Sequence, residues 1–281
     1  MECTLAAPAP GGVLDRMTST ALRPLPLLLL LAAAARPAGA ADDRHRFVAV
    51  ADEPIRVAFL VSEGATLIDF AGPWEVFQDV MVDAAGKPIR TMAQMESDPG
   101  ARHPFTLYTV AESKAPLRVS GGLGLVPDHT FADAPAPDLV VVPAHRASDA
   151  ELAWLRKVSG AADLTMSVCT GASVLARAGL LDGQRATTHA WFVEPLGQRF
   201  PKATFVAGAR FVESGRVASS AGLSAGIDLA LRVVERYLGR EVAAGTAEFM
   251  EYQGEGWKVP GAEPLARRRA ARRDAPPAPG R

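Results

Sequence analysis

Short apolar runs alternate with stretches of helical spacing along residues 54–257. The runs are rich in β-branched residues, which is typical of buried strands, and they cover 55–61, 105–110, 138–143 and 164–168. Apolar residues at helical spacing predict helices over 72–82, 150–158, 170–178, 223–238 and 242–250. Strands that alternate with helices favour a single α/β domain whose mostly parallel sheet is covered on both faces.

The segments between these elements are less regular. Residues 84–104 have no pattern and are predicted to be a loop, whereas 117–126 is predicted to form a hairpin around Gly121-Gly122. Residues 204–207 and 210–219 alternate as strands, with a turn at Ser214-Gly215. Pro73 suits the first turn of the helix over 72–82. The helix over 223–238 has an apolar face that suits either the core or an interface between subunits.

The N-terminal end departs from this pattern. Leu27 to Ala35 is an uninterrupted apolar run, too short for the ~20 residues of a membrane-spanning helix. Ala38-Gly39-Ala40 follows it, which is typical of a signal-peptidase site. We therefore predict a signal peptide over 1–40, with Met17 as an alternative start, a linker over 41–53, and a periplasmic or secreted protein without a membrane anchor. A disordered extension rich in alanine and leucine is the alternative.

Charge is distributed unevenly along the chain. The whole chain has a net charge of −1, but residues 258–281 contain seven Lys or Arg and two acidic residues, together with five prolines. This composition predicts a disordered basic tail. The remaining body is mildly acidic, so we expect no nucleic-acid partner. The chain has no phosphate-binding glycine motif and no cluster with metal-ligand spacing, so we expect neither a nucleotide nor a metal cofactor.

Cys169 is the candidate reactive residue. The other cysteine, Cys3, lies in the predicted leader, so the exported chain would keep one thiol without an internal partner. Cys169 directly follows the strand over 164–168 and precedes a helix, which predicts a nucleophile elbow in which Gly171 allows close packing. A helix N-terminus favours a thiolate, so we expect a lowered pKa of the thiol. A small buried structural cysteine is the alternative.

Three separated motifs resemble the ThiJ/PfpI superfamily, which belongs to the class I glutamine amidotransferase-like folds. They are LIDFAGPWEVF, VCTGASVLARAGLLDGQRATTHA and SAGLSAGIDLALRVVERYLG, and the resemblance extends over about residues 55–250. Within the superfamily the chain is most similar to the branch of isonitrile hydratases and AraC-type regulators. The resemblance implies a flavodoxin-like three-layer sandwich and a homodimer.

The resemblance also implies a catalytic site. Cys169 matches the family nucleophile, Asp69 the acidic residue placed against its sulfur, and Thr170 the threonine that follows the cysteine in isonitrile hydratases. A carboxyl group that faces a thiolate has a raised pKa and can shuttle protons. A helix cap near Gly72-Pro73 is the alternative role for Asp69. Because Thr170 stands where peptidase-like members have histidine, a cysteine–histidine dyad of that type is absent.

Further pocket residues follow from the same resemblance. Ala144-His145 replaces the usual Gly-Gly pair, whose backbone N–H groups form an oxyanion pocket. His145 either points toward Cys169 as a base or ligand, or is a polar loop residue at the strand end. His189 matches a histidine near the pocket, with a packing role as the alternative. The segment 219–222 either places a backbone turn near the site or caps the following helix. Three aromatic residues are expected in the core rather than in a pocket: Trp74, Trp191 and Phe192.

Three functions are compatible with this sequence. The first is a cysteine-dependent hydratase or hydrolase acting on a small molecule, which converts an isonitrile to an N-substituted formamide if the hydratase resemblance holds. The second is a non-catalytic domain that binds a small molecule or senses stress, related to the ligand domain of AraC-type regulators. The third is the handling of reactive carbonyls, of the glyoxalase or deglycase type, or redox chemistry of the thiol.

Overall fold

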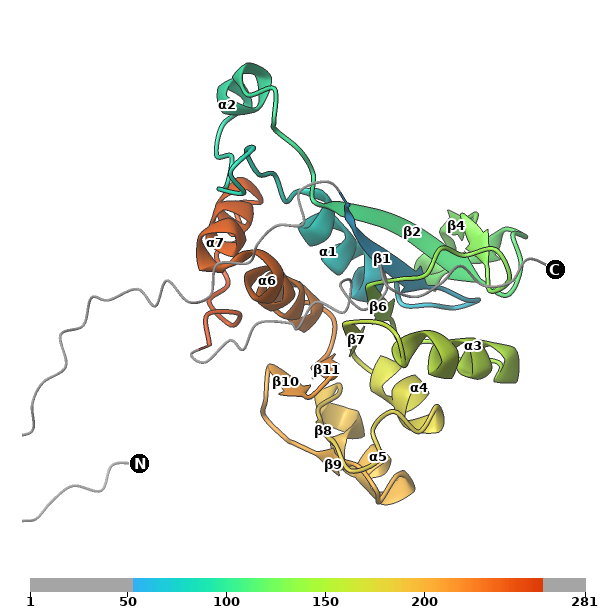
Figure 1. The fold of residues 1–281 in the computed structure, drawn as a ribbon. Coiled ribbons are helices and arrows are strands. Elements are labelled where there is room, and N and C mark those ends of the chain that lie inside the picture. The colour runs from blue at the N-terminus through green and yellow to red at the C-terminus, as the bar shows by residue number, and fades with distance from the viewer. Residues whose placement is uncertain (1–52, 260–281) are drawn as a thin grey trace, which may run out of the picture. The chain divides into compact units, whose positions relative to one another are not determined.

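A seven-stranded sheet is the framework of residues 53–259, which the computed structural model describes (Figure 1). Its strands are, in spatial order, β10 (Phe211–Ser214), β11 (Val217–Ser220), β7 (Leu164–Ser167), β6 (Leu139–Val142), β1 (Ile55–Leu60), β2 (Phe105–Ala111) and β5 (His129–Thr130). Every neighbouring pair is parallel except β10 and β11. The predicted α/β class with a mostly parallel sheet is therefore confirmed. The carboxyl ends of β1, β6 and β7 lie together at one edge of the sheet.

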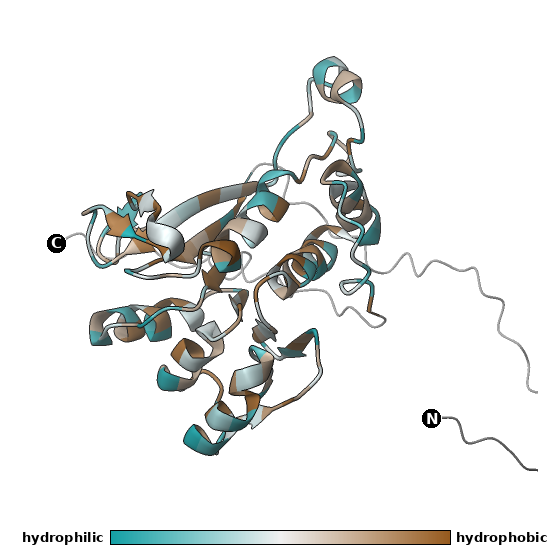
Figure 2. Ribbon diagram, turned by 180° about the vertical axis from the view of Figure 1, so that it is seen from behind, coloured by the Kyte–Doolittle hydropathy of each residue, from teal (hydrophilic) through white to brown (hydrophobic). Residues whose placement is uncertain are grey.

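Helices cover both faces of this sheet. One face carries α1 (Leu67–Gln78), α6 (Ala225–Leu238) and α7 (Arg240–Phe249), and the other carries α3 (Asp149–Ser159) and α4 (Gly171–Arg177). Val57 and Phe59 of β1 pack with the first group, whereas Ala58 and Leu60 pack with the second. Burial on both faces explains why the central strands are uninterrupted apolar runs. Figure 2 shows apolar residues along the strands and on helix sides that face them.

Helix α6 lies inside the domain. All of its residues except Ile227 and Leu238 are buried, and α1 and α7 pack against it. Its apolar face therefore contributes to the core of the subunit, which decides between the two roles expected for it. The homodimer stays a prediction.

Helix α1 differs from the prediction at its N-terminal end. It begins at Leu67 rather than near Gly72, and Pro73 lies inside it instead of in its first turn. The early start is stabilised by other segments, since Thr66 N–H donates to the carbonyl oxygen of Ala144 and Leu67 N–H donates to the Ser120 hydroxyl. These contacts come from residues distant in the chain, so local spacing could not reveal them.

Several peripheral elements complete the chain. The predicted hairpin is present as β3 (Leu117–Arg118) and β4 (Gly124–Leu125), and β10 and β11 form the hairpin predicted around Ser214-Gly215. The prediction of a loop over 84–104 is wrong in part, because it contains α2 (Met92–Ser97), which buries no residue and so has no apolar pattern. The sequence analysis also missed α5 (Val193–Arg199), of which only Leu196 is buried, and β8 (Arg185–Ala186), which pairs with β9 (Thr204–Phe205).

The two predicted terminal segments lie outside the described residues. This applies to the leader over 1–40, to all of the linker over 41–53 except its last residue, and to residues 260–281 of the tail. Trp257, at the predicted end of the domain, is buried between Arg240 and Lys258. No helix within residues 53–259 is long and apolar enough to cross a membrane.

Candidate active site

Cys169 lies at a strained junction between β7 and α4. Its φ of 57° is in the left-handed region, which is unfavourable for a residue with a Cβ and is typical of functional sites. The backbone on both sides is held in place: Cys169 N–H donates to the carbonyl oxygen of Ala221 at 3.1 Å, and the buried Thr188 hydroxyl donates to the Cys169 carbonyl at 2.9 Å. The predicted nucleophile elbow is therefore present in the structure.

Gly171 lets the first turn of α4 approach the end of β6. A Cβ at this position would lie 2.2 Å from the carbonyl oxygen of Val142 and 2.9 Å from that of Pro143. Both atoms belong to the backbone and cannot turn away, so only glycine fits. The close packing expected at Gly171 is thus confirmed.

Asp69 belongs to the first turn of α1 and is fully buried. Its Oδ2 accepts a hydrogen bond from Ala144 N–H at 3.1 Å, whereas its Oδ1 is buried without a partner in the described chain. Burial raises the pKa of Asp69 from 3.8 to about 6, although the bond from Ala144 acts in the opposite direction. A buried acceptor without a partner is costly, and at this position it leaves one oxygen free to exchange a proton.

The thiol of Cys169 lies close enough to Asp69 for their charges to interact. Burial of the sulfur, and then the negative charge of Asp69, raise the pKa of Cys169 above its ordinary value of 9.0. Hydrogen bonds from the backbone N–H groups of Thr170 and Leu223 and from the Thr170 side chain oppose this increase without reversing it. The expectation of a lowered pKa is therefore wrong, because burial and a neighbouring carboxylate outweigh the helix terminus. At neutral pH the proton resides on sulfur and the negative charge on Asp69.

His145 faces away from the thiol. Its Nδ1 lies 2.9 Å from the carbonyl oxygen of Pro143, and its Nε2 pairs with the carboxylate of Glu151. Both ring nitrogens are therefore already engaged by groups other than the thiol. The ring offers no free nitrogen to Cys169, so its role as a base for the thiol is excluded. It anchors the loop between β6 and α3.

The ring of His189 lies at the edge of the site, where it contacts Gly222 rather than the sulfur of Cys169. A Cβ at Gly222 would lie 2.4 Å from Cδ2 of His189, so the ring packs directly on the turn that precedes Leu223. Its Nδ1 accepts from Trp191 N–H at 3.3 Å, which leaves Nε2 as the protonated nitrogen.

The three aromatic residues expected in the core do not share one environment. Trp74 packs on Phe59 in the core, as expected. Trp191 and Phe192 are 83% and 43% exposed, contrary to expectation. Both belong to a short turn of 3₁₀ helix over Ala190–Phe192 that buries no residue, so their apolar character does not place them inside the domain.

Two contributors to the site were missed by the sequence analysis. Leu223 supplies a backbone N–H to the sulfur and has a φ of 54°, so two of the three non-glycine residues with positive φ in the described chain meet at this site. Thr188 holds the elbow but gives no signal in the sequence beyond its place next to His189. The segment 219–222 does bring a turn to the site, since Ala221 accepts from Cys169.

The predicted residues thus divide into two groups. Asp69, Ala144, Cys169, Thr170 and Gly171 are brought together at the carboxyl edge of the sheet, whereas His145 and His189 lie at its margin. Within residues 53–259 no group of three or more His, Cys, Asp or Glu side chains is placed to hold a metal ion. The arrangement can supply a nucleophile, one mobile proton, and three hydrogen-bond donors around the sulfur.

Comparisons with known proteins agree with this geometry. The sequence model of the DJ-1/PfpI family matches residues 55–236. Isonitrile hydratase from Pseudomonas putida is 28% identical over 204 residues, which cover 70% of this chain and 78% of that protein. The HTH-type transcriptional regulator GbdR from Pseudomonas aeruginosa is 27% identical over 205 residues, which cover 71% of this chain but only 51% of the regulator.

The fold is also found among solved structures. A ThiJ/PfpI family protein from Pseudomonas syringae superposes with a TM-score of 0.60 at 24% identity, covering 80% of this chain and 85% of the other. These matches confirm the resemblance inferred from the three motifs and the flavodoxin-like fold that it implied.

Proposed function

Because this chain belongs to the DJ-1/PfpI family and pairs a buried carboxyl group with an elbow cysteine, we propose that it is a cysteine-dependent hydratase of isonitriles. The observation that carries the proposal is the buried carboxyl group of Asp69, whose charge acts on Cys169, whose Oδ1 has no hydrogen-bond partner in the described chain, and whose pKa is raised to about 6. The similarity to isonitrile hydratase supplies the substrate class.

The first step transfers a proton and forms a carbon–sulfur bond. Asp69 accepts the thiol proton as the sulfur attacks the terminal carbon of R–N≡C, and this proton is then delivered to the same carbon. The product is a covalent thioimidate, R–N=CH–S–Cys169. The raised pKa of Asp69 makes its protonated form accessible near neutral pH, which suits a group that first accepts and then donates a proton.

The second step adds water and restores the thiol. Asp69 accepts a proton from the water that attacks the thioimidate carbon and passes it to the nitrogen, which gives R–NH–CH(OH)–S–Cys169. Collapse of this tetrahedral intermediate expels the sulfur, which takes up the hydroxyl proton by way of Asp69, and releases R–NH–CHO. The N–H groups of Thr170 and Leu223 and the Thr170 hydroxyl stabilise negative charge on sulfur in both steps.

Formamide production from a simple alkyl isonitrile tests this proposal. Cys169→Ala and Asp69→Asn are each expected to lower kcat/KM by at least about a thousandfold. Ser97→Ala, which changes an exposed hydroxyl on α2 outside the site, should retain more than half of the activity. Turnover that persists in Cys169→Ala would refute the proposal.

A sensing function is the second candidate. It is favoured by the raised pKa of Cys169, which keeps the thiol protonated at neutral pH, and by the similarity to GbdR. Stabilisation by an isonitrile or formamide without turnover would favour it. The raised pKa argues against thiol redox chemistry, which needs a thiolate. Formation of lactate from methylglyoxal tests the reactive-carbonyl alternative.

Export is a separate part of the proposal. It rests on the apolar run 27–35 and on Ala38-Gly39-Ala40, which are typical of a cleaved signal peptide. Expression of the full chain in a bacterium, followed by fractionation and N-terminal sequencing, should give periplasmic or secreted protein that begins at Ala41. Protein that remains in the cytoplasm with its leader intact would contradict export.

A further inference from the structure

A cavity of about 540 Å³ opens beside the elbow. It is lined by Thr66, Ala144, His145, Arg146, Thr170, Ser173, Arg177 and Arg199. Thr170 connects it to the site because the same side chain also hydrogen-bonds to the Cys169 sulfur. Its volume lies in the range of small-molecule sites.

The lining of this cavity is cationic. It contains three arginines and no acidic residue, and within residues 53–259 no carboxylate forms an ion pair with any of the three. Arginine is the side chain best suited to bind carboxylate or phosphate groups, through its planar fork of donors. Among the described residues the cavity therefore presents positive charge without a carboxylate as counter-ion.

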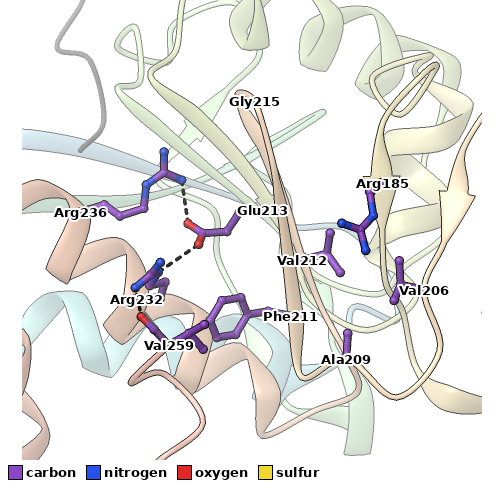
Figure 3. A pocket seen from close by; sticks show the side chains of 10 residues that line it. All are labelled: Arg185, Val206, Ala209, Phe211, Val212, Glu213, Gly215, Arg232, Arg236 and Val259. Atoms are coloured by element: carbon purple, nitrogen blue, oxygen red, sulfur yellow. Dashed lines mark hydrogen bonds and ion pairs between the residues drawn. The ribbon is translucent and has the colours of Figure 1, made fainter. Parts of the chain in front are cut away.

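A second cavity, of about 470 Å³, provides a contrast (Figure 3). It too is lined by three arginines, but Glu213 accepts from both Arg232 and Arg236 there. Figure 3 shows this ion-pair cluster on one side of β10 and Arg185 on the other. Two of its three arginines are thus paired with a carboxylate of the protein, unlike the arginines of the cavity beside Cys169.

The cationic side chains are held by the fold rather than gathered by chance. Thr170, Ser173 and Arg177 follow one another along one side of α4. Arg177 uses one N–H for the carbonyl oxygen of Ala147 at 2.9 Å, which leaves its other donors for a ligand. The guanidinium group of Arg199 lies 5.6 Å from the ring centroid of Phe200. These two contacts restrain the exposed side chains of Arg177 and Arg199 before any ligand arrives.

We propose that this cavity binds an anionic group of the carboxylate or phosphate type, carried by the same small molecule whose electrophilic carbon meets Cys169. The inference rests on the proposed function and specifies its substrate class. Thr170 and Arg177 are seven positions apart along α4, a backbone rise of about 10 Å, so the substrate would need a spacer of that order between its electrophilic carbon and its anionic group. Neutral isonitriles would then be poorer substrates than those ending in an anion.

Alkylation of Cys169 tests this binding independently of hydration. The full chain is treated at one alkaline pH with three iodoacetamides, whose side chains end in a butanoate, a propylphosphonate or a neutral butanoate methyl ester. Peptide mass spectrometry gives the rate at Cys169, and each rate is divided by that of glutathione with the same reagent. Ratios between reagents cancel any change in the pKa of Cys169.

The matched variants are Arg177→Gln, Arg199→Gln and Arg216→Gln. Arg216 is the control because it also donates to one backbone carbonyl, that of Gly160, but lies outside the cavity. Arg146 is left unchanged because it also borders a cavity that contains Glu63 and Glu112.

We expect at least one anionic reagent to react about tenfold faster than the ester, and each cavity variant to remove most of this preference. The preferred anion then distinguishes carboxylate from phosphate. A preference that is absent, or unchanged in a variant that carries both Arg177→Gln and Arg199→Gln, overturns the proposal even if isonitriles are hydrated. If Cys169 in the native protein reacts with none of the reagents, thermal unfolding provides the test. Glutarate, a dianion, should raise the Tm of the wild type, whereas the neutral glutaramide should not. Glutarate should no longer raise the Tm of a variant that lacks Arg177 and Arg199.

Discussion

Replacing Asp69 by asparagine removes a charge that the fold holds at a cost. The carboxyl group is fully buried, and burial raises its pKa from 3.8 to about 6. One pKa unit corresponds to about 1.4 kcal/mol, so folding disfavours the ionised carboxylate by about 3 kcal/mol. Asparagine has nearly the same shape and keeps an oxygen that can accept from Ala144 N–H.

The pH dependence of this effect has a defined sign. Between pH 3.8 and about 6 the folded protein binds more protons at Asp69 than the unfolded chain does, so the free energy of unfolding of the wild type falls as pH rises. The asparagine side chain of the variant does not titrate. The two proteins should therefore be nearly equally stable near pH 4, and Asp69→Asn should be more stable by up to about 3 kcal/mol at pH 8.

Urea unfolding at pH 4, 6 and 8, followed by tryptophan fluorescence, measures this difference. Asp182→Asn is the control, because Asp182 is half exposed in an ion pair with Lys202 and should show no comparable gain. Hydration activity is measured on the same samples and should be lost only in the Asp69 variant. An Asp69→Asn protein that is less stable at every pH, or equally stabilised at pH 4 and pH 8, would refute the assigned cost of ionisation.

Three further outcomes follow from the site. The rate of Cys169 alkylation by iodoacetamide should rise with an apparent pKa above 9.0, and a profile centred below pH 8 would contradict the burial of the thiol. Gly171→Ala should lower the free energy of unfolding by about 3 kcal/mol, because its Cβ meets two carbonyl oxygens, whereas Gly197→Ala has nothing within 4 Å and should be neutral or mildly stabilising. Thr188→Val should lower the free energy of unfolding by about 1–3 kcal/mol and reduce activity at least tenfold, because the backbone of Cys169 loses the hydrogen bond that holds it. Thr246→Val, which loses a similar buried bond in α7, should cost stability alone; equal activities of the two variants would contradict the role of Thr188.

The sequence was least informative where the site departs from ordinary packing. A buried carboxyl group interrupts the apolar pattern of α1 at Asp69, so the helix was predicted to begin after it. The turn before α6 was visible as Ser219 to Gly222, but the strained Leu223 beyond it was not. Functional residues that violate a local rule are expected to escape an analysis built on local rules.

Sequence by itself determined the central strands and the elbow. A strand buried on both faces must be a contiguous apolar run, and the junction that displays Cys169 is set by immediate neighbours in the chain. Tertiary structure alone decided the electrostatics of the site. The direction of the Cys169 pKa shift, the Oδ1 of Asp69 without a hydrogen-bond partner, and the cavity arginines without a carboxylate partner within residues 53–259 depend on which distant segments cover each group. Desolvation and Coulomb energies follow distance in space rather than distance along the chain, so no local pattern encodes them.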